Sequence, residues 1–260
     1  TSDVEDFDVT LDFLAYDAET TRRAQALFPF TPYVMISSAW VSQYILDQRI
    51  FSPREHEYIR GKLRAETLLE EKFRDGFPVK IIRLPLTFGS NDHTNRFHFY
   101  LSRCKRDKPI IMIDGGVNDG TLAFKDDVSA ILLRFISSFL SDQRLLYEAL
   151  PRPSICPRDL VTLISDLLHK HTSFLTIARE KLQQDFPEYL EVEPLSRETC
   201  YAHDHTDLYK LTGFSPTPVH AWVSALIKER NPDFKRAESS WNSKGFLTKE
   251  AYWIRKYDRS

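Results

Sequence analysis

The chain has 260 residues, of which 42% are hydrophobic and 28% charged, shares typical of a folded globular protein and not of a disordered or collagen-like one. Its 35 basic and 37 acidic side chains give a net charge of -2, which argues against recruitment of nucleic acid or anionic lipid by overall charge. Cys104, Cys156 and Cys200 fit neither a disulfide framework nor a zinc motif. Because no apolar run approaches the ~18 residues of a membrane span and no signal pattern opens the chain, the sequence predicts a cytoplasmic protein.

The N-terminal part alternates strand and helix patterns. Residues 7–15 are a short run of strand formers, and residues 18–28 have a helical composition. Residues 32–38 are apolar with almost no alternation, which is typical of a parallel strand covered on both faces. A capped helix is then predicted to start at Ser52, because Glu55 stands in capping-box register.

The rest of the chain continues this alternation. The capped helix is expected to end before Gly76, and buried strands are expected at residues 79–84 and 109–114. Further helices are predicted at residues 95–105, 126–139, 157–169 and 217–229. Strands that alternate with helices predict an α/β fold with a doubly wound, Rossmann-like parallel sheet.

The domain organisation is predicted as a sheet domain with an added lobe. The Rossmann-like cofactor domain is expected in residues 1–90, with residues 121–150 returning to it. Residues 91–120 and 151–260 are expected to form a smaller substrate-binding lobe with a C-terminal extension, because strands become scarce and prolines frequent there.

Tyr58 and Lys62 form the main candidate for catalysis. They lie four residues apart on the capped helix, so their side chains share one face. A phenol with a pKa near ~10 is a poor proton shuttle at neutral pH, and a neighbouring cation lowers that pKa by stabilising the phenolate. Ser38 ends a buried parallel strand, where open α/β sheets place ligand-binding groups, so its hydroxyl can bind the same substrate oxygen. A Tyr and a Lys at this spacing also arise by chance, so the order of the surrounding motifs carries the argument.

Five stretches in order resemble the extended short-chain dehydrogenase/reductase family, the NAD-dependent epimerase/dehydratases. They read VMISSAWV at 34–41, YIRGKLRAE at 58–66, RLPLTFG at 83–89, FKDDVSA at 124–130 and DLYKLTGF at 207–214. The resemblance implies an enzyme that uses NAD or NADP to act, as an epimerase, dehydratase or reductase, on a hydroxyl or ketone of a small, sugar-like substrate. It also implies a homodimer formed through the Tyr58 helix and its neighbour.

The same resemblance implies roles for single residues. Tyr58 matches the family's acid/base, Lys62 the residue that holds the nicotinamide ribose and lowers the tyrosine pKa, and Ser38 the serine that binds the reacting oxygen. Further contacts to the cofactor are implied for Leu14, Ala15, Tyr16 and Pro85.

The sequence departs from the family pattern at three places. Its first glycine is Gly61, so no Gly-rich phosphate turn precedes the Tyr58 segment, and the cofactor domain is expected to be N-terminally incomplete. The glycines of residues 111–120 have the wrong spacing for that turn. Leu86 stands where sugar-nucleotide enzymes often carry Asn, and Ser42 where a Tyr is usual, which argues against a nucleotide-sugar substrate.

Several alternatives remain open. Arg96 and Arg103 can hold an anionic substrate group as a pair, or they are solvated helix residues, the interpretation that the sequence favours. The chain can instead be a degenerate, non-catalytic family member that serves as a binding or scaffold protein, with the basic and aromatic residues 244–259 contacting RNA. Metal ligation is not predicted, because His169 with His171, and His203 with Asp204, His205 and Asp207, lack a further ligand cluster at informative spacing.

Overall fold

The structure is a computed structural model in which the chain divides into two compact units. It describes residues 7–48, 51–92, 94–106, 109–117, 122–137, 143–149, 154–193, 195, 207–229 and 246–257. The first unit draws on residues 1–87, 126–151 and 202–215, and the second on residues 88–125, 152–201 and 216–260. The two units are of similar length, and each is described by itself below.

The first unit is built on a four-stranded sheet with the order β1-β2-β3-β7, in which every neighbouring pair is parallel. The strands are β1 (Thr10–Asp12), β2 (Tyr33–Ser38), β3 (Val79–Leu84) and β7 (Leu146–Glu148). In the register of β2 and β3, Ser38 lies opposite Leu84, so both strands end at the same edge. This edge is the carboxyl edge of the sheet, and it carries the candidate site.

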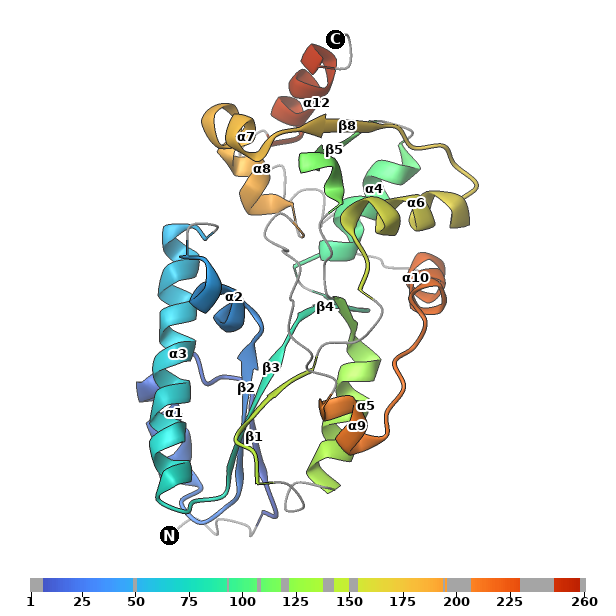
Figure 1. Ribbon diagram of the computed structural model, residues 1–260. Coiled ribbons are helices and arrows are strands. Elements are labelled where there is room, and N and C mark those ends of the chain that lie inside the picture. Colours follow the sequence, from blue (N-terminus) through green and yellow to red (C-terminus); the bar gives the residue numbers. More distant parts are fainter. Residues whose placement is uncertain are drawn as a thin grey trace. The chain divides into compact units, whose positions relative to one another are not determined.

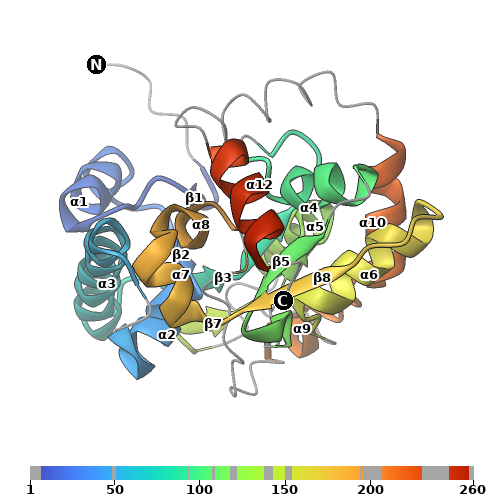
Figure 2. The ribbon, with the colours of Figure 1, turned by 90° about the horizontal axis from the view of Figure 1, so that it is seen from above.

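Helices cover both faces of this sheet. On one face lie α1 (Ala18–Leu27) and α3 (Pro53–Arg74), which run side by side (Figures 1 and 2). On the other face α5 (Lys125–Ser137) packs on β7 through an edge-to-face contact of Phe135 with Tyr147, and α9 (Asp207–Thr212) also contacts β7. A parallel sheet covered on both faces confirms the predicted α/β, doubly wound fold class.

Local sequence signals explain where the long helix begins and ends. At its start, Ser52 and Glu55 form the predicted capping box. After its last turn, Gly76 adopts a φ of 86°, which is a conformation that side chains disfavour. α2 (Trp40–Leu46), which the sequence analysis did not predict, follows β2 directly.

The core between α3 and the sheet uses alternate residues of the strands. Tyr33 and Met35 of β2 and Val79 and Ile81 of β3 pack with Ala65 and Leu69 of α3, all essentially inaccessible to solvent. Strand residues two apart share a face, so the next positions on this face are Ser37 and Arg83. On this face of the sheet, the polar residues Ser37 and Arg83 therefore lie between the apolar core and the carboxyl edge.

The second unit contains a two-stranded parallel sheet and most of the remaining helices. β5 (Ile110–Ile113) pairs with β8 (Phe174–Ile177), and the two lie side by side in Figure 2. The pairing places residues 109–114, a predicted strand, in a sheet separate from that of the first unit. The helices are α4 (Arg96–Lys105), α6 (Pro157–Leu167), α7 (Arg179–Asp185), α8 (Pro187–Val192), α10 (Val219–Lys228) and α12 (Phe246–Tyr257).

Short elements complete the described chain. They are β4 (Leu86–Phe88), where the chain passes from the first unit to the second, β6 (Leu122–Phe124) and the 3₁₀ turn η2 (Asp114–Gly116). In the second unit Phe88, Phe97 and Phe124 surround Trp222. Among the helices described here, none has the length and apolar character that crossing a membrane requires.

Candidate active site

The carboxyl edge of the first unit's sheet brings Ser38 and Tyr58 into one region. Ser38 is the last residue of β2, and Trp40, two residues later, packs edge to face against the Tyr58 ring at a centroid distance of 6.3 Å. The backbone N–H of Trp40 donates to Ser38 Oγ over 3.2 Å. Because this bond occupies a lone pair of Oγ, the hydroxyl hydrogen can be directed to another acceptor.

Lys62 lies beneath this surface, one helical turn after Tyr58. Its Nζ donates to the carbonyl oxygen of Ile36 over 2.9 Å and lies 5.1 Å from the centroid of the Tyr16 ring. The side chain is 2% exposed. Burial lowers the pKa of Lys62 from its ordinary 10.5 to about 8, although the charges of Asp12 and Glu66 oppose the shift.

Asp12 ends β1 and shapes the same corner. Its carboxylate accepts a hydrogen bond from the Tyr33 hydroxyl, and its Oδ1 accepts one from the backbone N–H of Leu14 over 2.7 Å. Burial and this hydrogen bond raise the pKa of Tyr33 above its ordinary value. The phenol of Tyr33 thus remains a proton donor, and Asp12 fixes the turn that follows β1.

The residues expected to bind the cofactor after β1 differ in their exposure to solvent. Leu14 and Tyr16 are 67% and 51% exposed, whereas Ala15 is buried in the core. Tyr16 lies against Tyr58, with the ring centroids 6.3 Å apart. Pro85, directly after β3, is buried. Tyr16, Tyr58, Lys62 and the end of β2 are therefore brought together, whereas Ala15 and Pro85 are buried.

Gly61 permits this close approach. A Cβ atom at this position would lie 2.5 Å from the carbonyl oxygen of Tyr16, closer than two such atoms can be. The segment after β1 can thus touch α3 only because residue 61 has no side chain. In the sequence Gly61 stands out only as the first glycine of the chain, because the residue that it contacts, Tyr16, lies forty-five positions away.

Directly behind the site lies a buried ion-pair network that the sequence analysis missed. The guanidinium of Arg83 on β3 donates to Glu66 on α3 from Nε over 3.0 Å and from Nη2 over 2.5 Å. Glu66 Oε1 also accepts a hydrogen bond of 2.5 Å from Ser37, the neighbour of Ser38. Glu66 is four residues after Lys62 and lies on the same helix face, which is the signal that could have indicated its place.

Ser42 and Glu148 extend the network to α2 and β7. Arg83 Nη1 donates to Ser42 Oγ over 2.9 Å and lies 3.4 Å from Glu148 Oε1, and the Ser42 hydroxyl donates to Glu148. Burial alone would lower the pKa of Arg83, but its bonds to Glu66 and Glu148 outweigh burial and raise it. Ser42, which appeared in the sequence as a departure from the family pattern, thus bridges two charged side chains.

Arg96 and Arg103 belong to the second unit, and each guanidinium is held by a different carboxylate. Arg96 lies 3.7 Å from Asp92 in an ion pair with a partly exposed side chain. Arg103 donates to both carboxylate oxygens of Glu250 on α12, over 2.8 and 2.9 Å, and its guanidinium stacks on the Phe99 ring. At 4% exposed, Arg103 is not the solvated helix residue that the sequence favoured. Its geometry is that of a buried link between α4 and α12.

The histidines considered as metal ligands fall in two groups. His169 and His171 are exposed, at the end of α6 and in the segment that follows. His203, Asp204 and His205 lie outside the described residues, and of Asp207 only the backbone is described. Within the described ranges, no group of three or more His, Cys, Asp or Glu side chains is arranged to hold a metal ion.

No family model and no curated protein matches the chain. Among solved structures, it is similar to dTDP-glucose 4,6-dehydratase from Bacillus anthracis in complex with NAD, with a TM-score of 0.62 and 14% identity over 88% of this chain and 75% of that one. RMD from Pseudomonas aeruginosa, complexed with NADPH, gives a TM-score of 0.58 and 15% identity over 88% of this chain and 82% of that one. UDP-glucuronic acid 4-epimerase from Bacillus cereus, in complex with UDP-glucuronic acid and NAD, gives a TM-score of 0.57 and 15% identity over 85% of this chain and 67% of that one.

These similarities extend over most of the chain and include both of its units. They confirm the expected likeness to extended short-chain dehydrogenase/reductase structures at the level of the fold. Function in such folds depends on the residues of the site and not on the fold alone.

Proposed function

We propose that the chain binds NAD or NADP at the carboxyl edge of the first unit's sheet and acts on a hydroxyl or ketone of a small, sugar-like substrate. The observation that carries this proposal is the meeting of Tyr58, Lys62 and Tyr16 beside the end of β2. Open α/β sheets bind ligands at this edge. The solved structures of similar fold in complex with NAD or NADPH support the choice of cofactor.

The residues present fit the nicotinamide-ribose half of such a cofactor. Leu14 and Tyr16 offer exposed apolar and aromatic surface, and Lys62 offers an ammonium that has used one of its three donors on Ile36. Residues 1–60 contain no glycine and so no Gly-rich turn for the pyrophosphate. When bound, the nicotinamide accepts or returns a hydride.

Within this proposal each side chain of the site has a separate task. Tyr58 donates or accepts the proton of the reacting oxygen through its hydroxyl. Lys62 holds the ribose and, while protonated, stabilises the phenolate form of Tyr58. Ser38, whose Oγ already accepts from the Trp40 N–H, donates to the same substrate oxygen and fixes its position. Whether the net reaction is epimerisation, dehydration or reduction depends on the substrate.

Turnover by the Tyr58→Phe variant tests the catalytic role. The substitution removes one hydroxyl and leaves the ring contacts with Tyr16 and Trp40 in place, so folding should be kept. Oxidation of NADH and NADPH is followed with a panel of keto sugars and sugar alcohols. Since general acid–base catalysis contributes ~100- to 10,000-fold, kcat should fall by about that factor. A variant that keeps full turnover would contradict the proposal.

The proposal includes cytoplasmic residence and a homodimer formed through α3 and its neighbouring helix. The length and exposure of α3 make it a suitable surface for a second copy, and sedimentation of the purified chain measures its mass directly. The alternative function is a non-catalytic binding or scaffold role. It would be supported by a chain that binds neither cofactor.

A further inference from the structure

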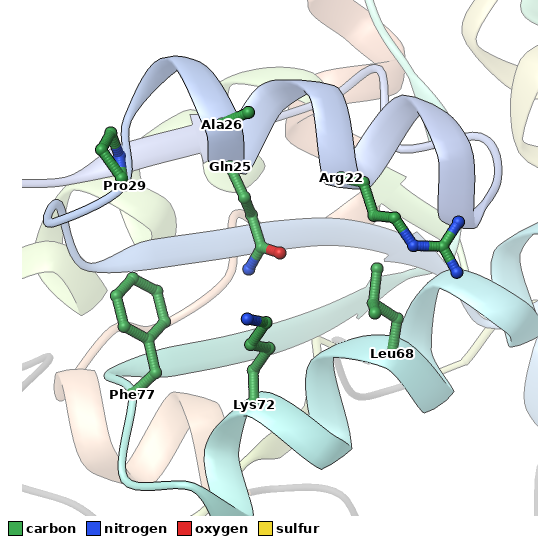
Figure 3. A pocket seen from close by; sticks show the side chains of 7 residues that line it. All are labelled: Arg22, Gln25, Ala26, Pro29, Leu68, Lys72 and Phe77. Atoms are coloured by element: carbon green, nitrogen blue, oxygen red, sulfur yellow. The ribbon is translucent and has the colours of Figure 1, made fainter.

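A pocket opens on the first unit, away from the candidate active site. It has a volume of about 460 Å³ and lies between α1 and the C-terminal half of α3 (Figure 3). Lys72, on its wall, is ten residues after Lys62, which places it about 15 Å further along the helix. The pocket is therefore separate from the Tyr58 and Lys62 site.

The polar side chains that line this pocket offer more hydrogen-bond donors than acceptors. Lys72, Arg22 and Gln25 line it, and no carboxylate does. In the described part of the chain the ammonium group of Lys72 has no ion-pair or hydrogen-bond partner. Arg22 has one ion pair, to Glu19, whose atoms are 3.8 Å apart and whose side chains are both more than half exposed. Such an exposed pair leaves the guanidinium able to turn to a ligand.

Gln25 adds a donor that lacks an acceptor. Its Nε2 is buried and has no hydrogen-bond partner among the described residues. Figure 3 shows the Gln25 amide, from α1, and the Lys72 ammonium, from α3, directed toward one another across the pocket. A buried donor without an acceptor is costly, and an anionic oxygen between these two groups would satisfy both.

The remaining walls are apolar. Leu68 and Phe77 face the two donors in Figure 3, and Ala26 and Pro29 close the α1 side. Phe77 also packs on the buried cluster between α3 and the sheet, which holds its ring in place. A ring wall beside a cluster of donors suits a ligand with a flat apolar body and an acidic group. The volume lies within the ~300–1,000 Å³ of ordinary small-molecule sites.

We propose that this pocket binds a small organic anion, in which a carboxylate or phosphate group lies between Lys72, Arg22 and the Gln25 amide and an apolar body lies against Phe77. The site needs no nicotinamide cofactor and no reaction, so it stands independently of the function proposed above. The chemistry is shared by aryl carboxylates and aryl phosphates, and the experiment distinguishes them.

The test follows the side-chain amide signals of Gln25 by NMR on the whole chain, titrated separately with phenyl phosphate, benzoate and inorganic phosphate. Phenyl phosphate or benzoate should shift these signals saturably at millimolar concentration or below, and the tighter of the two identifies the acidic group. Inorganic phosphate should bind more weakly, because it has no apolar body. The titration is run at two protein concentrations, so that self-association is seen as well.

Two variants on the same helix make the test specific. Lys72→Met removes the ammonium and keeps the aliphatic stem, and because a charge-assisted bond is worth ~1.5–3 kcal/mol it should weaken binding by about tenfold or more. Arg74→Met is the matched control, since Arg74 pairs with Glu70 and does not line the pocket. Its affinity should equal that of the unmodified chain.

Three results would overturn the proposal. They are unshifted Gln25 signals with both aryl anions, equal affinities for Lys72→Met and Arg74→Met, and inorganic phosphate binding as tightly as phenyl phosphate. Because Lys72 and Arg74 are both exposed, neither substitution endangers the fold.

Discussion

Two neighbouring residues of α3, Gly61 and Lys62, determine how the segment after β1 meets the helix. Gly61 allows the carbonyl of Tyr16 to approach the helix backbone, and Lys62 then lies under the Tyr16 ring. Neither contact is needed to form the helix, since both residues would adopt a helical backbone conformation without it. At the scale of single residues, the geometry of the site therefore depends on the absence of a side chain at Gly61 and on the buried charge of Lys62.

Gly61→Ala should destabilise the protein, against the trend of helix propensity. In an unobstructed helix the change would stabilise by up to ~1 kcal/mol. Here the new Cβ lies 2.5 Å from the Tyr16 carbonyl, so the segment must move. We expect a net loss of ~1–3 kcal/mol in the free energy of unfolding, as for other overpacked sites.

Urea denaturation measures this loss, with the exposed Glu71→Ala on the same helix as the control, expected within ~0.5 kcal/mol of the parent. Equal stability of the Gly61→Ala variant and the parent would show that Tyr16 does not approach α3 as described.

The buried charge of Lys62 predicts a specific dependence of stability on pH. Because burial lowers its pKa from 10.5 to about 8, the unfolded chain binds a proton between these pH values that the folded chain does not. The free energy of unfolding therefore rises with pH in this window. Below pH 8 it is lowered by the full cost of burying the charged ammonium group.

Lys62→Met removes this titration and serves as the reference for it. The free energy of unfolding of the parent relative to the variant should increase by up to about 3 kcal/mol as the pH is raised across that window. Denaturation of both proteins at a series of pH values gives the difference between their free energies of unfolding. The titrations of groups that both proteins share cancel in this difference. A difference that does not change with pH would mean that Lys62 is solvated.

At the scale of elements, the Arg83 network fixes α3 on the sheet behind the site. Glu66 binds Arg83 of β3 and Ser37 of β2, while Ser42 and Glu148 connect the same guanidinium to α2 and β7. Five elements, α3, β3, β2, α2 and β7, are thus joined by one buried network. Burying these charges is expensive, and the network is stable only when each charge keeps its partner.

A double-mutant cycle on this network tests the coupling. Arg83→Met leaves both Glu66 and Glu148 without their common cation and should cost ~3–5 kcal/mol in the free energy of unfolding, whereas Glu66→Met leaves Arg83 its second carboxylate, Glu148, and should cost less. The double variant removes both charges of the Glu66 and Arg83 pair, and it should cost clearly less than the sum of the two single losses. Urea denaturation of the four proteins gives the coupling energy, and additive losses would refute the paired geometry.

The elements themselves were predictable where local signals are strong. The capping box at Ser52, the φ of Gly76 and the apolar run of β3 mark boundaries that the sequence alone predicts. β7 (LYE) and β8 (FLTI) were missed, since neither is the continuous run of aliphatic residues that marks the equally short β5 (IIMI). Their strand character comes from pairing with β3 and β5.

The site was predictable only in part, for a related reason. The Tyr58 and Lys62 spacing lies within one helix, and Ser38 was found from its position at the end of a buried parallel strand. Glu66 and Arg83 meet across seventeen positions, and Arg103 and Glu250 across 147. Such contacts are set by the packing of whole elements, and one sequence does not reveal them. Arg103 thus appeared as a surface residue, whereas it is buried beside Phe99.

At the scale of the whole molecule, each unit has its own buried core and its own ion pair between elements. In the first unit this is the Arg83 network, and in the second it is the pair of Arg103 with Glu250. The likeness to the three solved structures described above runs through both units, over 85–88% of this chain. The candidate catalytic side chains, however, all lie in the first unit.

The central claim is that the first unit binds a nicotinamide cofactor beside Tyr58 and Lys62. Its most direct test is a fluorescence titration of the whole chain with NADH and with NADPH, together with Lys62→Ala and Tyr58→Phe. We predict saturable binding that Lys62→Ala weakens about tenfold or more, since one charge-assisted bond is lost, and that Tyr58→Phe leaves nearly unchanged. Absence of binding at millimolar concentrations of both cofactors, or equal affinity of Lys62→Ala and the parent, would contradict the account.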